Sequence, residues 1–310
     1  MNVPVIAFFN SKGGVGTTSL VYHLAWMFND LRVNVLAVDL DPQADLTAAF
    51  LGADLPDVWR DLTVSACVRQ VRGGTLDSFA AVVDENLSLL PGDLRLSDFE
   101  EELALEWHKR PLAVHSALWS TIQQLASLSD SQLVLLDLGP NLSAINRAGL
   151  LCADHIVVPV APDLSSLEGL RSLGPALARW RAVDIELPTG PMRPLGYVVL
   201  LRSVRFDRPV NGNSNWIGRI PDEYRTYVLS ETGDSAVPIQ DDPYNLAVLK
   251  AYPGLMSMAQ EAGKPMFHLK PADGALGAYL QSAEEARKAF EALARAIVAK
   301  ADLPLTLPVI

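Results

Sequence analysis

The chain of 310 residues contains only two cysteines, Cys67 and Cys152, which lie far apart in the sequence. Two cysteines are too few for a disulfide framework, and no C-x-x-C pair is present to hold zinc or an iron–sulfur cluster. Long apolar runs are also missing, since no stretch of about eighteen apolar residues occurs. No N-terminal segment combines a basic region, an apolar core and a small-residue cleavage site. We therefore expect a cytoplasmic protein without a membrane partner.

Positive charge is scarce as well, because 25 Lys and Arg residues stand against 36 Asp and Glu residues, a net charge of −11. This balance opposes general attraction to nucleic acid, so any DNA contact must come from a local basic patch. Apolar residues make up 49% of the chain, enough to bury a sizeable core. We expect one domain over residues 1–310, with a variable helical insertion at about 50–130.

The most informative stretch lies near the N-terminus, where an apolar run, Val5–Phe9, is followed by a glycine-rich turn and then by apolar residues at helical spacing. This order predicts a buried strand, a turn and a helix. The glycines of Gly13–Gly16 allow successive backbone N–H groups to point at a polyphosphate, at the positive end of the helix. Thr18 is placed to put its hydroxyl on the accompanying Mg²⁺. An ordinary glycine turn is the alternative, and it does not explain the lysine and the threonine pair in this order.

The string Lys12-Gly-Gly-Val-Gly-Thr-Thr18 resembles the deviant Walker A motif of the ParA/MinD ATPases, K-G-G-x-G-K-T/S. The resemblance implies an α/β, three-layer P-loop NTPase fold with a mostly parallel sheet flanked by helices. It implies ATP or ADP with Mg²⁺ as cofactors, and a homodimer in which Lys12 reaches the partner's phosphates. The residues that it assigns to the nucleotide are Lys12, Gly13, Gly14, Val15, Gly16, Thr17, Thr18 and Ser19, with Asn141 and Pro265 from later segments.

Thr17 departs from this motif, because ordinary P-loops place there the lysine that reaches the β and γ phosphates. A charged hydrogen bond contributes about 1.5–3 kcal/mol, so its loss is expected to weaken nucleotide binding by about ten- to a hundredfold. The charge that develops in the transition state would also lose a partner. Three interpretations stay open: a natural variant that hydrolyses ATP slowly, a pseudo-ATPase, or an altered form of a lysine-bearing protein.

Three acidic residues follow strand-like runs. Asp39 and Asp41 end the second run, in a D-x-D-P-Q segment, where the carboxyl ends of parallel strands face a ligand crevice. By the resemblance, Asp41 orients or polarises the attacking water and is catalytic together with Lys12, while Asp39 lies near the Mg²⁺ shell. Asp137 ends the apolar run after Gln132 and is placed to hold a Mg²⁺-bound water. The predicted metal residues are therefore Thr18, Asp39 and Asp137; acids that cap turns and helices are the alternative.

Two later segments carry further nucleotide predictions. Asn141 stands in the segment with which the family senses the γ-phosphate. Lys264-Pro265-Met266 is similar to the family's late G-K-P segment, which lies near the base. Leu201 occupies the position at which relatives usually carry an asparagine that reads adenine.

One stretch is basic, with five arginines among three acids. The corresponding region of ParA proteins contributes to nonspecific DNA binding through phosphate contacts. Solvated arginines, or arginines that face an acidic partner subunit, are the alternatives. The arginines concerned are Arg202, Arg205, Arg208, Arg219 and Arg225.

The rest of the chain alternates strand-like and helical runs, which predicts a parallel sheet wrapped by helices. Strands are expected at 33–40, 86–90, 132–137, 155–160 and 195–201. Helices are expected at 113–128, 164–181 and 282–299.

The favoured function is an ATP-binding, dimerising switch of ParA type that partitions a plasmid or chromosome or positions another cargo. A ParB-like partner would trigger hydrolysis, the step that Thr17 weakens. The alternative is a non-catalytic pseudo-ATPase that acts as an interaction or regulatory module. An ATP-dependent biosynthetic ligase would need a second polar constellation, and the sequence has none.

Overall fold

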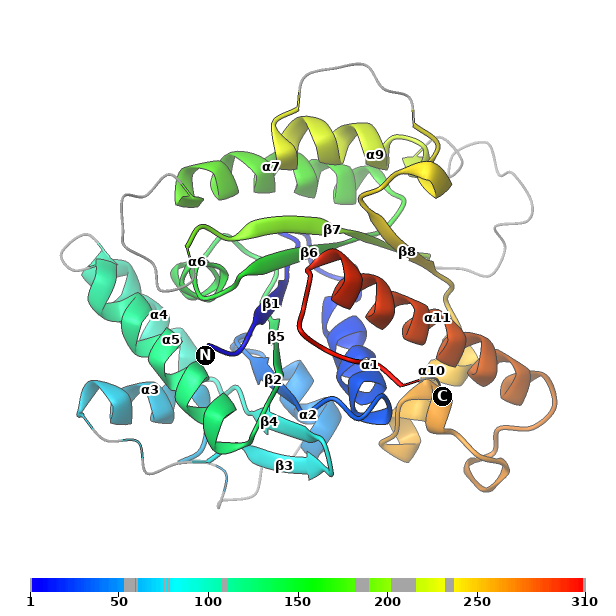
Figure 1. Ribbon diagram of the computed structural model, residues 1–310, viewed down its shortest axis with the longest axis horizontal. Coiled ribbons are helices and arrows are strands. Elements are labelled where there is room, and N and C mark those ends of the chain that lie inside the picture. The colour runs from blue at the N-terminus through cyan, green and yellow to red at the C-terminus, as the bar shows by residue number, and fades with distance from the viewer. Residues whose placement is uncertain are drawn as a thin grey trace.

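The computed structural model describes residues 2–52, 59, 61–74, 76, 79–107, 111–181, 190–201, 216–231 and 237–308. The described residues contain one eight-stranded sheet with the order β3-β4-β2-β5-β1-β6-β7-β8 (Figure 1). All neighbouring strands are parallel except β3 and β4. The strands are β1 (Val5–Phe8), β2 (Val35–Asp39), β3 (Ala81–Asp84), β4 (Leu87–Leu90), β5 (Leu133–Asp137), β6 (His155–Val160), β7 (Arg193–Leu200) and β8 (Asn245–Leu249).

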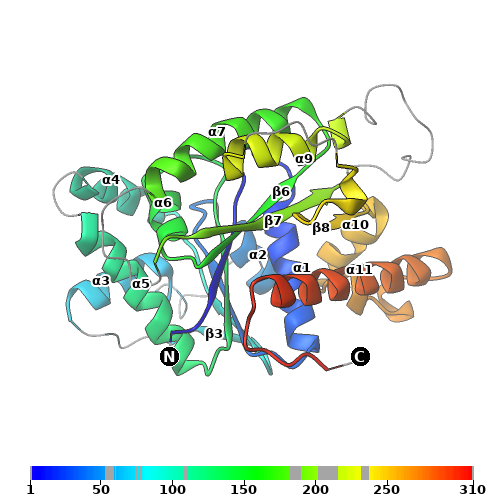
Figure 2. The ribbon, with the colours of Figure 1, turned by 45° about the horizontal axis from the view of Figure 1, so that its top comes forward.

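Helices cover both faces of this sheet. Figure 2 shows α7 and α9 on one side of β6 and β7, with α1 and α11 on the other. The α-helices are α1 (Thr17–Asp30), α2 (Asp45–Leu51), α3 (Val64–Arg72), α4 (Leu96–Trp107), α5 (Pro111–Leu128), α6 (Ala144–Leu151), α7 (Leu164–Arg181), α9 (Ile220–Glu223), α10 (Pro253–Ala262) and α11 (Ala278–Lys300). A π-helix, η3 (Tyr224–Leu229), and three 3₁₀ turns, η4 (Ile239–Asp241), η5 (Met266–His268) and η6 (Pro271–Asp273), complete the described elements.

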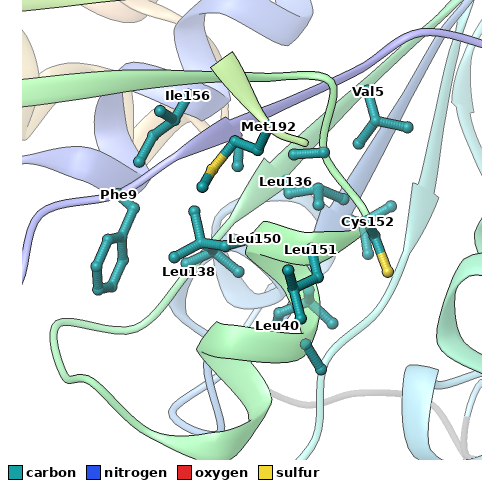
Figure 3. Packing of buried hydrophobic residues seen from close by; sticks show 14 of the residues in the cluster. Val5, Phe9, Leu40, Leu136, Leu138, Leu150, Leu151, Cys152, Ile156 and Met192 are labelled. Atoms are coloured by element: carbon teal, nitrogen blue, oxygen red, sulfur yellow. The ribbon is translucent and has the colours of Figure 1, made fainter. Parts of the chain in front are cut away.

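The core is divided by the sheet into two clusters, because successive side chains of a strand point to opposite faces. In β1, Val5 and Ala7 join the cluster beneath α4 to α7, whereas Ile6 and Phe8 join the cluster beneath α1 and α11. Figure 3 shows the first cluster between the sheet and α6, with Leu150 of α6 among its labelled residues. A strand that is buried on both faces needs a continuous apolar run, as the sequence has here.

The predicted three-layer α/β arrangement is confirmed, and the predicted strands and helices are present with boundaries that differ by a few residues. The sequence analysis did not predict β3, β8, α2, α6 or α10. Both missed strands lie at the edges of the sheet, and each carries an exposed valine, Val82 or Val248, in place of a side chain buried in the core. The segment predicted as a helical insertion at about 50–130 also supplies β3 and β4 to the sheet.

The polypeptide packs unusually closely where α7 meets η3. A Cβ built on Gly174 of α7 would lie 1.9 Å from the carbonyl oxygen of Tyr227. A side chain at position 174 is therefore incompatible with this packing, and the glycine allows the π-helix to lie against α7.

Candidate nucleotide site

The loop between β1 and α1 has a backbone that depends on glycine. Gly14 and Gly16 have φ angles of 74° and 97°, in the left-handed region that other residues rarely adopt. Gly16 also precedes α1 as its N-cap, and no side chain caps the helix there. The first N–H groups of α1 are thus available to an anion, and the helix dipole favours negative charge at this end.

The glycine loop is anchored by Asn10, which the sequence analysis did not single out. Asn10 is 1% exposed; its Nδ2 donates to the carbonyl of Pro159 (2.7 Å) and its Oδ1 accepts from the N–H of Lys12 (3.0 Å). A Cβ built on Gly169 would lie 2.5 Å from Oδ1, so α7 also approaches this side chain closely. A polar residue directly after a buried apolar strand was the available signal.

Thr17, Thr18 and Ser19 form the first turn of α1, as predicted from the motif. All three are half-buried. Position 17 is the one at which other P-loops carry the phosphate-binding lysine. A threonine at this position supplies no positive charge.

The acidic residues of β2 and β5 lie side by side, because Asp39 and Asp137 are register partners in adjacent parallel strands. The Asp39 carboxylate is satisfied within the chain: it accepts from the N–H and hydroxyl of Thr47 (2.8 and 2.7 Å) and from the N–H of Asp41 (3.1 Å). Burial raises the pKa of Asp39, while the hydrogen bonds from Thr47 act in the opposite direction. Asp39 thus links the end of β2 to the start of α2 through its hydrogen bonds with Thr47.

Asp137 differs from its neighbour, since neither carboxylate oxygen has a hydrogen-bond partner in good geometry among the described residues, although the side chain is fully buried. Burial raises its pKa well above the usual range, and the charge of Asp39 raises it further, while the nearby Thr18 hydroxyl lowers it. A buried carboxylate without donors is costly unless a ligand or cation compensates it.

This arrangement fits a magnesium ion held together with nucleotide phosphates. Within the described residues no group of three or more His, Cys, Asp or Glu side chains could hold a metal on its own. Mg²⁺ bound beside phosphates needs few protein ligands, because it keeps several waters and takes oxygens from the phosphates. Thr18 and Asp137 provide a hydroxyl and an unsatisfied carboxylate. The ion would neutralise phosphate charge. The Asp39 carboxylate, on the neighbouring strand β2, would add negative charge near the ion.

Asp41 lies on the loop after β2 and faces the loop after β5. A Cβ built on Gly139 would lie 3.1–3.2 Å from the Asp41 carboxyl atoms. The carboxylate accepts from the N–H of Gln43 (3.0 Å), and burial raises its pKa. The role of Asp41 in orienting water stays a prediction.

The two late nucleotide predictions lie in different environments. Asn141 is exposed, and its Oδ1 accepts from the N–H of Ser143 (3.1 Å). Pro265 is buried, and the next N–H, that of Met266, donates to Nε2 of His23 in α1 (3.2 Å). The late segment is therefore joined directly to the phosphate-loop helix.

A cavity of about 560 Å³ adjoins this junction. Thr18 and Ser19 of α1, residues of α2, and Lys264 beside Pro265 line it. The structure thus brings the start of the phosphate-loop helix and the late segment to one hollow.

The predicted DNA-binding arginines are only partly within the described residues. Arg202, Arg205 and Arg208 lie outside them. Arg219 pairs with Glu223 (3.0 Å), and Arg225 pairs with the buried Asp242 (2.7 Å). The DNA prediction stays a prediction, and Arg219 and Arg225 are each paired with a carboxylate of the chain.

A glycine loop that opens a helix after a buried strand, with aspartates at the ends of two neighbouring strands, defines a P-loop nucleotide-binding protein. A family model described as an AAA domain matches residues 3–183. This match covers more than half of the chain, which therefore belongs to that family, as a P-loop ATPase of the ParA/MinD type.

Curated relatives agree with this assignment. The chain is 30% identical over 172 residues to the sporulation initiation inhibitor protein Soj of Bacillus subtilis, covering 54% of this chain and 62% of that protein. It is 28% identical over 250 residues to the "probable plasmid-partitioning protein ParA" of Thermus thermophilus, covering 76% and 72%. The matches span 50% to 62% of the length of the first curated relatives.

Solved structures show the same fold. Apo McdA from Cyanothece superposes with a TM-score of 0.69 at 15% identity, covering 95% of this chain and 99% of that one. A plasmid partition protein from Borrelia burgdorferi superposes with a TM-score of 0.57 at 16% identity, covering 96% and 99%. The P-loop NTPase fold predicted from the sequence is thereby confirmed. Among the described residues, no helix combines the length and apolarity that crossing a bilayer requires.

Proposed function

We propose that the chain binds ATP with Mg²⁺ and dimerises around it, as a switch that partitions DNA or positions another cargo. The observation that carries this proposal is the buried Asp137 carboxylate, which has no donor in good geometry within the described part of the chain and lies near Thr18 at the start of α1. The relatives' names, Soj and plasmid-partitioning ParA, support the partitioning role. Lys12, on the exposed side of the loop, is the residue proposed to contact the partner's phosphates.

The test is equilibrium binding of ATP and of ADP, with and without Mg²⁺, together with sedimentation velocity. We expect Mg²⁺-dependent ATP binding and a dimer that forms with ATP and not with ADP. Lys12→Ala should retain binding by the monomer and lose the dimer. If neither nucleotide binds, the proposal fails.

Slow hydrolysis is the second part of the proposal, because Thr17 supplies no charge to the developing transition state. Asp41 is proposed to orient the attacking water. Steady-state phosphate release measures this step, and Asp41→Asn is the matched variant. The alternative function, a pseudo-ATPase that acts as an interaction module, is favoured by the same Thr17. It predicts an ATP-dependent dimer with no phosphate release above that of Asp41→Asn.

DNA binding is proposed for Arg202, Arg205 and Arg208, since Arg219 and Arg225 are already paired with carboxylates. Each phosphate contact releases counterions, so affinity should fall steeply as salt rises. Changing the three arginines to alanine should weaken DNA binding and flatten its salt dependence. Arg32→Ala is the control, because Arg32 is an exposed arginine in the turn between α1 and β2 and pairs with Glu85. A ParB-like partner is proposed to stimulate hydrolysis.

A further inference from the structure

The segment that follows β5 touches two parts of the site at once. A Cβ built on Gly13 of the phosphate loop would lie 3.4 Å from side-chain atoms of Pro140. A Cβ built on Gly139 would lie 3.1 Å from the carboxyl carbon of Asp41. Residues 139–141 therefore bridge the phosphate loop and the residue proposed to orient water.

This bridging segment is held by one side chain of α6, that of Asn146. Its Nδ2 donates to the carbonyl of Gly139 (2.7 Å), to the carbonyl of Asn141 (2.8 Å) and to Oδ1 of Asn141 (2.8 Å). The amide orientation is unambiguous, because the opposite orientation would place an oxygen against three acceptors. Asn146 is thus hydrogen-bonded to the residues on both sides of Pro140.

Asn146 is 1% exposed, and its Oδ1 is buried without a partner among the described atoms. The side-chain hydrogen bonds of Asn146 are therefore made by Nδ2, and these three contacts fix the position of the amide. The backbone of the same residue is fastened too, since its N–H donates to Oγ of the N-cap Ser143 (3.4 Å). Asn146 is consequently a rigid support for residues 139–141.

We infer that Asn146 is a positioning residue that sets the bridging segment for recognition of the third phosphate, and so determines how strongly the protein prefers ATP to ADP. This inference rests on the proposed function, because it assumes a nucleotide on the phosphate loop. In this inference the γ-phosphate is the part of the nucleotide that contacts residues 139–141. ADP lacks this phosphate, so we expect its affinity not to depend on the Asn146 amide.

The test compares ATP and ADP affinity, with Mg²⁺, in the wild-type chain, in Asn146→Ala and in Asn29→Ala. Asn29 is a matched control, because it is also buried and pairs with Asp84 and the N–H of Asn86, at the far end of α1. In Asn146→Ala we expect ATP affinity to fall about tenfold, the effect of losing an ordering hydrogen bond, with ADP affinity changed less than about twofold. Asn29→Ala should leave the ATP-to-ADP ratio unchanged. A merely structural role for Asn146 would lower the thermal midpoint and leave that ratio unchanged, which overturns the inference.

A second measurement needs no variant. Hydrogen exchange of the amides of residues 139–146 in the wild-type chain should slow with a slowly hydrolysed ATP analogue and stay unchanged with ADP. Equal protection by both nucleotides overturns the inference while leaving the proposed function standing. If the wild-type chain binds neither nucleotide, the proposed function fails and the inference falls with it.

Discussion

Asp39 and Asp137 occupy the same register position on adjacent parallel strands, yet one carboxylate is saturated with donors and the other has none in good geometry in the described structure. Asp39 is hydrogen-bonded to Thr47, whose hydroxyl also accepts from the N–H of Gly92 (2.8 Å). Two neighbouring acids therefore have different tasks. Asp39 maintains the backbone around the site, and Asp137 is the residue that we propose holds the cation.

Replacing Asp137 by asparagine should stabilise the nucleotide-free protein. The substitution removes a buried charge that burial and Asp39 both disfavour, and we expect a gain of about 1–3 kcal/mol in the free energy of unfolding. The same variant should lose the enhancement of ATP affinity by Mg²⁺. Denaturant unfolding and titration with ATP check the two effects.

Asp163→Asn is the control for that experiment. Asp163 also follows a strand of the sheet, but its Oδ1 caps α7 by accepting from the N–H of Ser166 (2.8 Å). Asparagine caps a helix about as well as aspartate, so this replacement should change stability little and leave the Mg²⁺ effect intact. A stability loss in Asp137→Asn would contradict the assignment of Asp137 as a strained cation ligand.

Thr17→Lys should tighten nucleotide binding and raise phosphate release. The introduced ammonium supplies the charged contact that ordinary P-loops have, so we expect affinity for ATP to rise about ten- to a hundredfold. Calorimetric titration and steady-state phosphate release measure the change. Unchanged affinity and turnover would show that position 17 does not face the phosphates.

His23 should make the folded protein sensitive to mild acid. Its Nδ1–H donates to the carbonyl of Ser19 (2.7 Å), and its Nε2 accepts from Met266. Burial lowers the pKa of His23 to about 4, and the nearby His268 lowers it too. Because this pKa lies below that of the unfolded chain, the stability contributed by neutral His23 is complete above about pH 6.5 and is lost as pH falls toward 4.

The expected loss from this group is about 2 kcal/mol between pH 7.5 and pH 5. The measurement is the difference in unfolding free energy between the wild-type chain and His23→Asn at each pH. The raised pKa values of Asp39 and Asp137 change stability with pH in the opposite direction, but equally in both proteins, so their effect cancels in the difference. A difference that does not depend on pH would show that His23 is not held neutral by its two contacts.

Gly174→Ala should disrupt the contact between α7 and η3. The added methyl would lie 1.9 Å from the carbonyl oxygen of Tyr227, so backbone must move, and we expect a cost of about 3 kcal/mol or more. Ser172→Ala, at an exposed position on the same helix, should change stability by less than about 0.5 kcal/mol. Thermal unfolding of both variants provides the comparison.

The amino-acid sequence by itself determined the parts of the fold that rest on local pattern. The run of apolar residues in β1 and the glycines after it predict a strand, a left-handed turn and a helix, because only glycine adopts these φ angles readily. Asp39, Asp41 and Asp137 were found for a similar reason, since each follows a buried strand and parallel strands end at one edge.

Only the tertiary structure decided what these residues contact. No pattern in the sequence shows that Asp39 is satisfied by Thr47 whereas Asp137 has no donor in good geometry among the described residues. Nor does any pattern show that Asn146 holds Gly139 and Asn141. Such contacts depend on how loops and helices from separate parts of the chain pack above the strand ends. Local sequence propensity does not depend on that packing. The contacts of neighbouring polar residues can therefore be seen only in the folded chain.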